Sequence, residues 1–335
     1  MRQARQKIVA VCGGDEAYTS VLLTGSGTAA LESAFASVVP SDGKMLVLQN
    51  GHYGRRLQEI LDAHQVPCDC LSFDWGTAFD LLALDQALAD DPAITHVGVV
   101  HHETSTGMLN PLREVGEITA RHGRSLAVDS ISSLGSESLD VRKDHIDWCV
   151  GTANKCLEGL PGISFVCAPR SKLEALSEFP ARGYYLDLHR HYVAQEKENA
   201  PAFTPAVQIL YAFDRALDLT LEETVQARAE RYGDRAWELR AGLRQLGFPP
   251  LLKEEQSSNG VTVAHLPDGI RYDDLHDALK RRGFIIYATQ KQLGSTVRIA
   301  TMGQLSKSDI TQFLSALEDI VLELSQRSSS VEKGA

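Results

Sequence analysis

The stretch LLTGSGTAALESAF, residues 22–35, begins like a buried strand, passes through a glycine-rich turn and continues like a helix. Gly25 and Gly27 allow a tight turn whose backbone amides converge, while Ser26 and Thr28 add hydroxyls beside the positive end of the helix dipole. Such a turn can bind a phosphate, although GSGT also makes an ordinary capped helix start. It matches neither the P-loop nor the GxGxxG fingerprint, because the GK[ST] ending and the third glycine are absent.

The same alternation of strand-like and helix-like segments runs from about Ala17 to Val166. It predicts an α/β fold, with a mostly parallel sheet and helices on both faces. Ligands of such folds bind beyond the carboxyl ends of the strands, so residues just after strands are the candidate site residues. The strand-like runs are SVLL, KMLVLQN, THVGVVHH, SLAVDS, IDWCVGT and GISFVCA, and the helix-like runs are TAALESAFASVV, GRRLQEILDAHQ, DLLALDQALAD and LREVGEITARHG.

The pattern changes after Pro169. An irregular segment rich in aromatic residues and histidine extends to Pro205, long helical patterns follow, and the remainder reads as a small α+β unit that ends in a helix. We expect a large domain over residues 1–220, a small C-terminal domain over 221–327 and a disordered tail over 328–335.

Size and charge limit the classes of function. The chain has 335 residues, 43% of them hydrophobic, and a net charge of -11 from 33 basic and 44 acidic side chains. This charge argues against a general nucleic-acid surface and against attraction to anionic membranes. No apolar run approaches the roughly 20 residues of a membrane span, and the start MRQARQK lacks the apolar core of a secretory signal. Six scattered cysteines without a CxxC pair suit reduced thiols, so we expect a cytoplasmic protein.

A single lysine lies in the segment TANKCLEGLPG, residues 152–162, just after the buried strand-like run IDWCVG. Burying an unpaired ammonium is costly. Either Lys155 extends past its neighbours into solvent, or its amine has a function that needs a dry, walled site.

Three other strand ends carry candidate residues. Asp129 ends the run LAVD, where it either caps a turn or accepts a hydrogen bond from a cationic ring nitrogen. Tyr53 in NGHYGRRL is either a core aromatic or a ring that stacks on a ligand. His101 and His102 suggest a metal, but adjacent strand residues point to opposite faces, so we expect no metal site.

Together, Ser26, Tyr53, Asp129 and Lys155 provide a phosphate cup, a stacking ring, a carboxylate and an amine, each after a strand. Pyridoxal 5′-phosphate needs these four features, because its phosphate is anchored, its ring is sandwiched, its pyridinium is paired and its aldehyde forms a Schiff base with a lysine. The most economical interpretation of Lys155 is therefore a Schiff-base lysine.

The chain resembles the class-V aminotransferases of fold type I over nearly its whole length. The resemblance implies a fold-type I architecture, a large cofactor-binding domain with a helix-sandwiched sheet plus a small α+β domain, and a homodimer with shared active sites. The matching segments are EAYTSVLLTGSGTAALES, NGHYGRR, HHETSTGMLNPLREVG, VDSISSLG, ANKCLEGLPG and VRIATMGQL.

The resemblance also implies residue roles. Lys155 would form the Schiff base and carry a proton, Asp129 would pair with the pyridinium, and Thr104 would bond near the phenolic oxygen or the substrate. Thr204 in FTPA matches a position that reaches the neighbouring subunit's phosphate. Arg298 in VRIATMG would bind the substrate's anionic group; without a carboxylate partner, a strand arginine suits such a fork-shaped ligand. By this resemblance the cofactor-binding residues are Ser26, Gly27, Thr28, Tyr53, Thr104, Asp129, Lys155 and Thr204.

The implied activity is transfer of an amino group from 2-aminoethylphosphonate to pyruvate, with a small amine donor and a keto-acid acceptor as the only expected partners besides a second subunit. Two departures concern the substrate: the family has an N-terminal glycine- and proline-rich strand that this chain lacks, and FTPA and YATQKQ replace the usual sequences after Thr204 and Tyr287. Alternatives are another class-V aminotransferase, of the alanine- or serine-glyoxylate type or for another aminophosphonate, or a truncated non-catalytic homologue. A cysteine desulfurase is disfavoured because all six cysteines precede Pro169.

Overall fold

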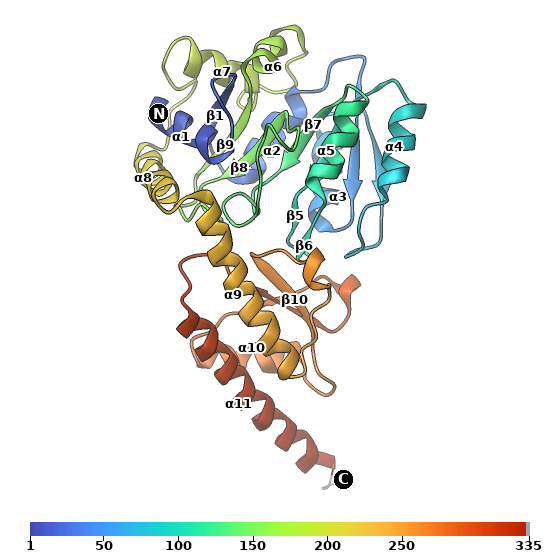
Figure 1. Cartoon of the computed structure of the whole chain (residues 1–335), viewed down its shortest axis with the longest axis vertical. Coiled ribbons are helices and arrows are strands. Elements are labelled where there is room, and N and C mark those ends of the chain that lie inside the picture. The colour runs from blue at the N-terminus through green and yellow to red at the C-terminus, as the bar shows by residue number, and fades with distance from the viewer. Residues whose placement is uncertain (333–335) are drawn as a thin grey trace.

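Seven strands form the large sheet at the centre of the computed structural model, which describes residues 1–332 (Figure 1). These strands are β1 (Tyr18–Thr24), β2 (Lys44–Gln49), β3 (Cys68–Ser72), β4 (Ile94–Val100), β7 (Ser125–Asp129), β8 (Trp148–Thr152) and β9 (Ile163–Pro169). Their order is β1-β9-β8-β7-β4-β2-β3, and β9 alone runs in the direction opposite to the other six strands. The prediction of a mostly parallel α/β fold is therefore confirmed.

Helices cover both faces of this sheet. Strand β2 shows why: Leu46 and Leu48 belong to the apolar cluster on one face, while Met45 and Val47 belong to the cluster on the other. Successive strand side chains alternate between faces, so a strand apolar throughout must be covered on both. The first cluster packs against α1 (Arg2–Val11), α4 (Leu81–Asp90), α5 (Leu112–Arg121) and α8 (Val207–Glu223), and the second against α2 (Gly27–Ser37), α3 (His52–Ala63), α6 (Arg170–Ala175) and α7 (Leu188–Glu196).

A second, antiparallel sheet lies in the lower part of the molecule in Figure 1. It consists of β10 (Val261–His265), β12 (Thr296–Ala300) and β11 (Tyr287–Ala288), in that order. A third apolar cluster joins it to α9 (Val225–Gln245), α10 (Tyr272–Arg281) and α11 (Lys307–Glu332). A small hairpin, β5 (His102–Glu103) with β6 (Met108–Leu109), leaves the end of β4 and approaches this sheet.

Several elements differ from the sequence-based expectation. The polar start forms α1, and the segment expected to be irregular contains α6, a 3-10 turn (Leu176–Glu178) and α7. Of the strand-like run FIIYAT only β11 pairs. Helix α11 extends to Glu332, the disordered tail expected over 328–335 stays a prediction, and residues 333–335 lie outside the described residues. Among the described residues, no helix is long and apolar enough to cross a membrane. The proposed boundary between domains at residue 220 stays a prediction.

Candidate active site

The carboxyl ends of β4, β7 and β8 and the first turns of α2 and α3 surround a pocket of about 210 Å³. Most of the candidate residues predicted from the sequence line this pocket, although they come from five separate parts of the chain. These are Ser26, Gly27, Thr28, Tyr53, Thr104, Asp129 and Lys155, and the wall also includes Arg56, Val100, His102, Ile131, Ser132, Thr152 and Asn154.

Asp129, the last residue of β7, is the buried acid of the pocket. Its side chain is nearly inaccessible, and one carboxylate oxygen accepts a hydrogen bond from the backbone amide of Ile131 at 2.9 Å. Burial, with a smaller contribution from the nearby Glu103, raises the pKa of Asp129 to about 7, although the hydrogen bond from Ile131 and the charges of Arg56 and Lys155 oppose the shift. A carboxylate in this setting favours a ligand that brings a positive charge.

Lys155 lies three residues after β8 and faces the same pocket. Its side chain is half-buried and forms no ion pair with any side chain that the structure describes. The amide of Glu158 donates to the Lys155 carbonyl at 2.9 Å, which closes a turn around the lysine. The amine is thus available to a ligand.

The glycine-rich turn places the start of α2 at the pocket. Gly27 is the first helical residue, and Ser26 precedes it without using its side chain as a cap. A Cβ on Gly27 would lie 2.6 Å from the Ile131 side chain, so the close approach of helix and pocket wall requires glycine. Because the first amides of a helix have no intrahelical acceptor, this end can hold an anion.

Tyr53 is held in place by a residue far away in the sequence. Helix α3 begins at His52, and the fully buried Glu103 accepts hydrogen bonds from the amides of Tyr53 at 2.9 Å and Gly54 at 3.0 Å. Its other oxygen accepts from the Ser105 hydroxyl at 2.5 Å. Glu103, the last residue of β5, therefore caps the start of α3 and holds the backbone that carries Tyr53.

Two further residues line the pocket: sequence reasoning missed Arg56 and considered His102 only as a metal ligand. The guanidinium of Arg56 lies over the Tyr53 ring, 4.6 Å from its centroid, and adds positive charge near Asp129. His102 has both ring nitrogens engaged, by the Ser132 carbonyl at 3.1 Å and the Ser258 hydroxyl at 2.6 Å. No local pattern identifies either residue, because both depend on which elements pack together.

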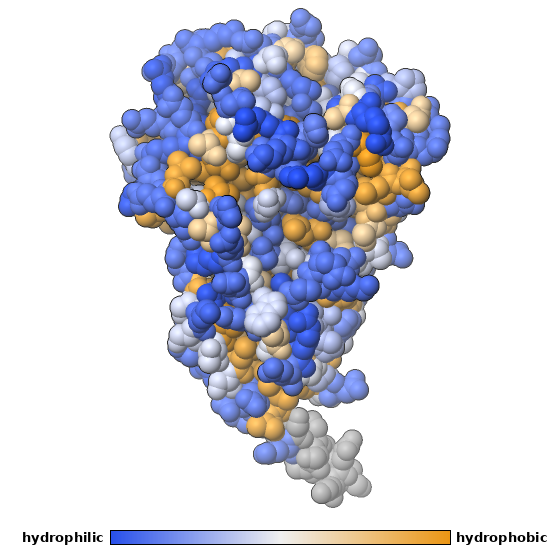
Figure 2. Space-filling model, viewed as in Figure 1, coloured by the Kyte–Doolittle hydropathy of each residue, from blue (hydrophilic) through white to orange (hydrophobic). Residues whose placement is uncertain are grey.

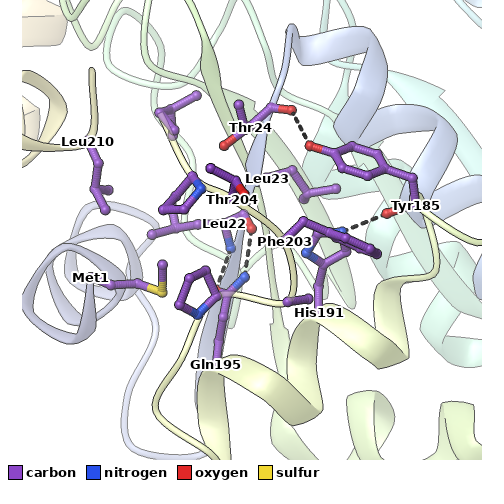
Figure 3. A pocket seen from close by; sticks show the side chains of 14 residues that line it. Met1, Leu22, Leu23, Thr24, Tyr185, His191, Gln195, Phe203, Thr204 and Leu210 are labelled. Carbon is purple, nitrogen blue, oxygen red and sulfur yellow. Dashed lines mark hydrogen bonds between the residues drawn. The ribbon is translucent and has the colours of Figure 1, made fainter. Parts of the chain in front are cut away.

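Arg298 and Thr204 do not line this pocket. Arg298 on β12 lies at its edge, where one guanidinium nitrogen donates to the Thr104 carbonyl at 3.4 Å and the group packs 5.7 Å from the Tyr287 ring centroid. Thr204 lies in a separate, small pocket of about 20 Å³ beside Tyr185 (Figure 3). It is exposed and does not contribute to the Lys155 pocket of its own chain.

The residues of the pocket fit pyridoxal 5′-phosphate. Asp129 lacks a cationic hydrogen-bond partner among the described residues, which a protonated ring nitrogen would supply. The amides at the start of α2 suit a phosphate, and Lys155 is unpaired. This fold with this site defines a pyridoxal phosphate-dependent enzyme of fold type I.

The chain belongs to the class-V aminotransferase family, whose sequence model matches residues 1–313. It is thus an enzyme that moves an amino group from an amine donor to a keto acid, with pyridoxal phosphate as cofactor. The 2-aminoethylphosphonate–pyruvate transaminase of Klebsiella pneumoniae is 37% identical over 321 residues, covering 94% of this chain and 87% of the relative. The enzyme of that name from Salmonella typhimurium is 36% identical over 323 residues, or 95% of this chain and 87% of the relative.

Solved structures agree with this family. Ureidoglycine–glyoxylate aminotransferase from Bacillus subtilis superposes with a TM-score of 0.90 at 25% identity, covering 96% of this chain and 84% of that one. Alanine–glyoxylate aminotransferase from Nostoc sp. superposes with a TM-score of 0.89 at 25% identity, covering 96% and 86%. The predicted fold-type I architecture is therefore confirmed.

Proposed function

We propose that this chain transfers the amino group of 2-aminoethylphosphonate to pyruvate, giving phosphonoacetaldehyde and L-alanine. The observation that carries the choice of donor is the unpaired guanidinium of Arg298 at the edge of the Lys155 pocket. Arg298 forms no ion pair with any side chain that the structure describes; its guanidinium instead contacts the Thr104 carbonyl and the Tyr287 ring. A half-buried arginine without a carboxylate partner suits a doubly charged phosphonate. The relatives named above support the same donor.

The cofactor and the pocket residues have separate roles in this reaction. Bound pyridoxal phosphate supplies an aldehyde that takes up the donor's amine and a ring that accepts the electrons of the broken C–H bond. The Lys155 amine holds the cofactor and, once free, moves the proton from the donor carbon. The Asp129 carboxylate keeps the ring nitrogen protonated, and Thr104 orients the bound molecules from the turn between β5 and β6. Ser26, Gly27 and Thr28 hold the phosphate.

Tyr53 and the pocket's depth also support this proposal. The Tyr53 ring, on a helix start that Glu103 holds in place, offers a flat apolar surface for a cofactor ring. The carboxylate of Asp129, the last residue of β7, is buried, so little water reaches it.

The test is the visible absorption spectrum of the purified protein loaded with cofactor, before and after 2-aminoethylphosphonate is added without a keto acid. We expect the cofactor's visible band to disappear and to return on addition of pyruvate. Borohydride should link the cofactor to Lys155, and Lys155→Ala should abolish turnover; retention of even a hundredth of the activity would refute the role of Lys155.

Other outcomes point to the alternatives. A band that responds to alanine or serine instead of the phosphonate would keep the enzyme class and replace the donor by one of the glyoxylate-aminotransferase type. The absence of any band after incubation with cofactor would favour a non-catalytic homologue. Either result would overturn the proposed donor.

We further infer that the chain forms a homodimer with shared active sites. Apolar side chains gather on the surface over α8 in Figure 2, and Val207, Tyr211 and Leu219 of this helix are each more than two-fifths exposed. Exposed apolar patches of this kind favour protein association. The exposed Thr204 lies just before the same helix, and we infer that it reaches a partner's cofactor phosphate. Sedimentation velocity should give a dimer, and Tyr211→Glu should yield monomers with weakened cofactor binding.

The protein's expected location is the cytoplasm. All six cysteines are free, and four of them are buried. Free thiols are stable in a reducing compartment, whereas exported proteins more often form disulfides. Fractionation of cells that express the chain tests this, since recovery in an exported fraction would contradict it.

A further inference from the structure

The turn after Lys155 contains an unusual backbone conformation. Glu158 has φ of 59°, in the left-handed region that glycine tolerates and a long side chain rarely adopts. Gly159 follows directly, so the chain has a glycine next to this position but not at it. A non-glycine residue held in this region points to a requirement for its side chain.

The Glu158 side chain bonds to three groups outside its own segment. Its carboxylate accepts hydrogen bonds from the Arg231 guanidinium at 3.0 Å and from the Tyr232 hydroxyl at 2.9 Å, both on α9. The Gln304 side-chain amide donates to the other carboxylate oxygen. The carboxylate is mostly buried, with 13% of the side chain exposed, so these bonds are shielded from water.

Helix α9 holds the lysine turn at a second point. The guanidinium of Arg228, one of the most deeply buried side chains, donates to the Cys156 carbonyl at 3.1 Å. Its charge is balanced by Glu223 at 2.8 Å, which also pairs with Arg231 at 2.6 Å. Two arginines and two glutamates therefore form a neutral buried cluster, which removing one partner would leave with an uncompensated charge.

The same cluster reaches the end of β12. The Tyr232 hydroxyl accepts a hydrogen bond from the Gly303 amide at 2.9 Å, and Arg231 donates to the Gly303 carbonyl at 3.1 Å. Gly303 and Gln304 follow β12 by only a few residues, and β12 carries Arg298. Glu158 thus connects the turn that bears Lys155 to the segment that follows Arg298.

We propose that Glu158, with Tyr232, is a positioning pair that fixes the separation between the Lys155 amine and the Arg298 guanidinium, and thereby the chain length of the accepted donor. This inference rests on the proposed function, in which Lys155 acts at the amine end of the donor and Arg298 binds its anionic end. The pair touches neither cofactor nor donor; it acts through the two segments that do.

The physical reason is that one donor must satisfy both groups at once. With a rigid connection, a donor whose amine and phosphonate match the fixed separation reaches the productive geometry, whereas a donor that is one carbon longer fits poorly. If the connection loosens, the disadvantage of the longer donor becomes smaller, because the two segments can move apart to fit it. The pair should therefore control discrimination between donors more than activity itself.

The experiment compares 2-aminoethylphosphonate with 3-aminopropylphosphonate on the cofactor-loaded protein. Two quantities are measured for each donor: kcat/KM with pyruvate, and the donor concentration that removes half of the cofactor's visible band without a keto acid. Tyr232→Phe removes one oxygen from the connection, and Glu158→Gly removes the carboxylate while relieving the backbone. We expect both variants to lower the preference for the shorter donor at least tenfold in both measurements.

Matched controls separate positioning from stability. Tyr192→Phe removes a buried hydroxyl that donates to Glu174 at 3.2 Å in another part of the fold, and Asn199→Gly relieves a similar φ of 53°. Both controls should keep the wild-type preference within twofold.

Should Glu158→Gly fail to fold, the result for Tyr232→Phe decides alone. An unchanged preference in a folded, cofactor-binding Tyr232→Phe would overturn the inference, whereas a wild type inert to both donors would instead overturn the proposed function.

Discussion

The imidazole of His102 accepts a hydrogen bond from the hydroxyl of Ser258, with 2.6 Å between Nε2 and Oγ. The direction of this bond follows from the other nitrogen: Nδ1 lies 3.1 Å from the Ser132 carbonyl oxygen, which can only accept, so Nδ1 carries the proton. His102 is therefore a neutral imidazole that connects the pocket wall to the segment before β10. Burial lowers its pKa to about 3.

His102 should stay neutral throughout the pH range in which the enzyme is stable. Nitrogen-edited NMR of the protein should find the Nδ1–H tautomer at pH 5, because protonation would place a buried charge against a hydroxyl donor. Ser258→Ala should cost about 1–3 kcal/mol of unfolding free energy by leaving Nε2 unpaired. A His102 resonance that titrates near its ordinary pKa would contradict this assignment.

Glu103→Ala should loosen Tyr53 and weaken cofactor binding. The substitution removes the acceptor for the amides of Tyr53 and Gly54 and leaves buried donors unpaired, at a cost of about 1–3 kcal/mol or more. Urea unfolding measures the stability change, and titration of the cofactor-free protein with pyridoxal phosphate measures its affinity. The control is Glu59→Ala, at an exposed position of α3, the helix that carries Tyr53. Equal affinities of the two variants for pyridoxal phosphate would argue against the role of Glu103.

Glu137 should make the protein less stable as pH rises. It is 3% exposed, accepts hydrogen bonds from the Asn259 backbone amide at 2.6 Å and side chain at 3.0 Å, and burial raises its pKa to about 8. Because the folded pKa exceeds the unfolded value of 4.5, the contribution of Glu137 is fully present below pH 4.5 and is lost as pH rises through 8.

Glu137→Gln cannot titrate, so it provides the comparison. As pH rises between the two pKa values, the unfolding free energy of the variant should increase relative to that of the wild type by up to about 1.4 kcal/mol per pH unit. Urea unfolding at several pH values measures this difference, with the exposed Glu16→Gln as control. Parallel curves for the wild type and Glu137→Gln would show that Glu137 is ionised in the folded state at all these pH values.

The sequence predicted those site residues whose positions depend on their own strand. Asp129 and Lys155 each follow a run of buried apolar residues, and in a parallel sheet such runs end at one edge. The alternation of strands and helices is a local property, so the large sheet could be predicted from it. The same holds for the turn at Gly27, where a glycine begins a helix.

Residues held by distant partners could not be predicted in this way. Glu103 caps a helix that begins some fifty residues earlier, and no spacing in the sequence connects the two. The start of the chain reads as polar because it contains Arg5, yet that guanidinium is buried and bonds to the carbonyl oxygens of Ser20 at 2.5 Å and Gln195 at 2.7 Å. Once its acceptors come from elsewhere in the fold, a charged residue can lie on the buried face of a helix.

Arg298 provides the prediction that bears most directly on the donor. Arg298→Gln should raise the donor concentration that removes half of the cofactor's visible band by about 100-fold, equivalent to roughly 3 kcal/mol, because it removes a charge-assisted pair of hydrogen bonds. Arg298→Lys should recover only part of this loss, since an ammonium keeps the charge without the planar fork. The cofactor's band in the absence of donor should be unchanged in both. Arg282→Gln, which breaks a surface pair with Asp319, is the control. If Arg298→Gln bound the phosphonate as tightly as the wild type, the donor's anionic group would have to be held by another cation of the pocket wall, and Arg56 would be the first to test.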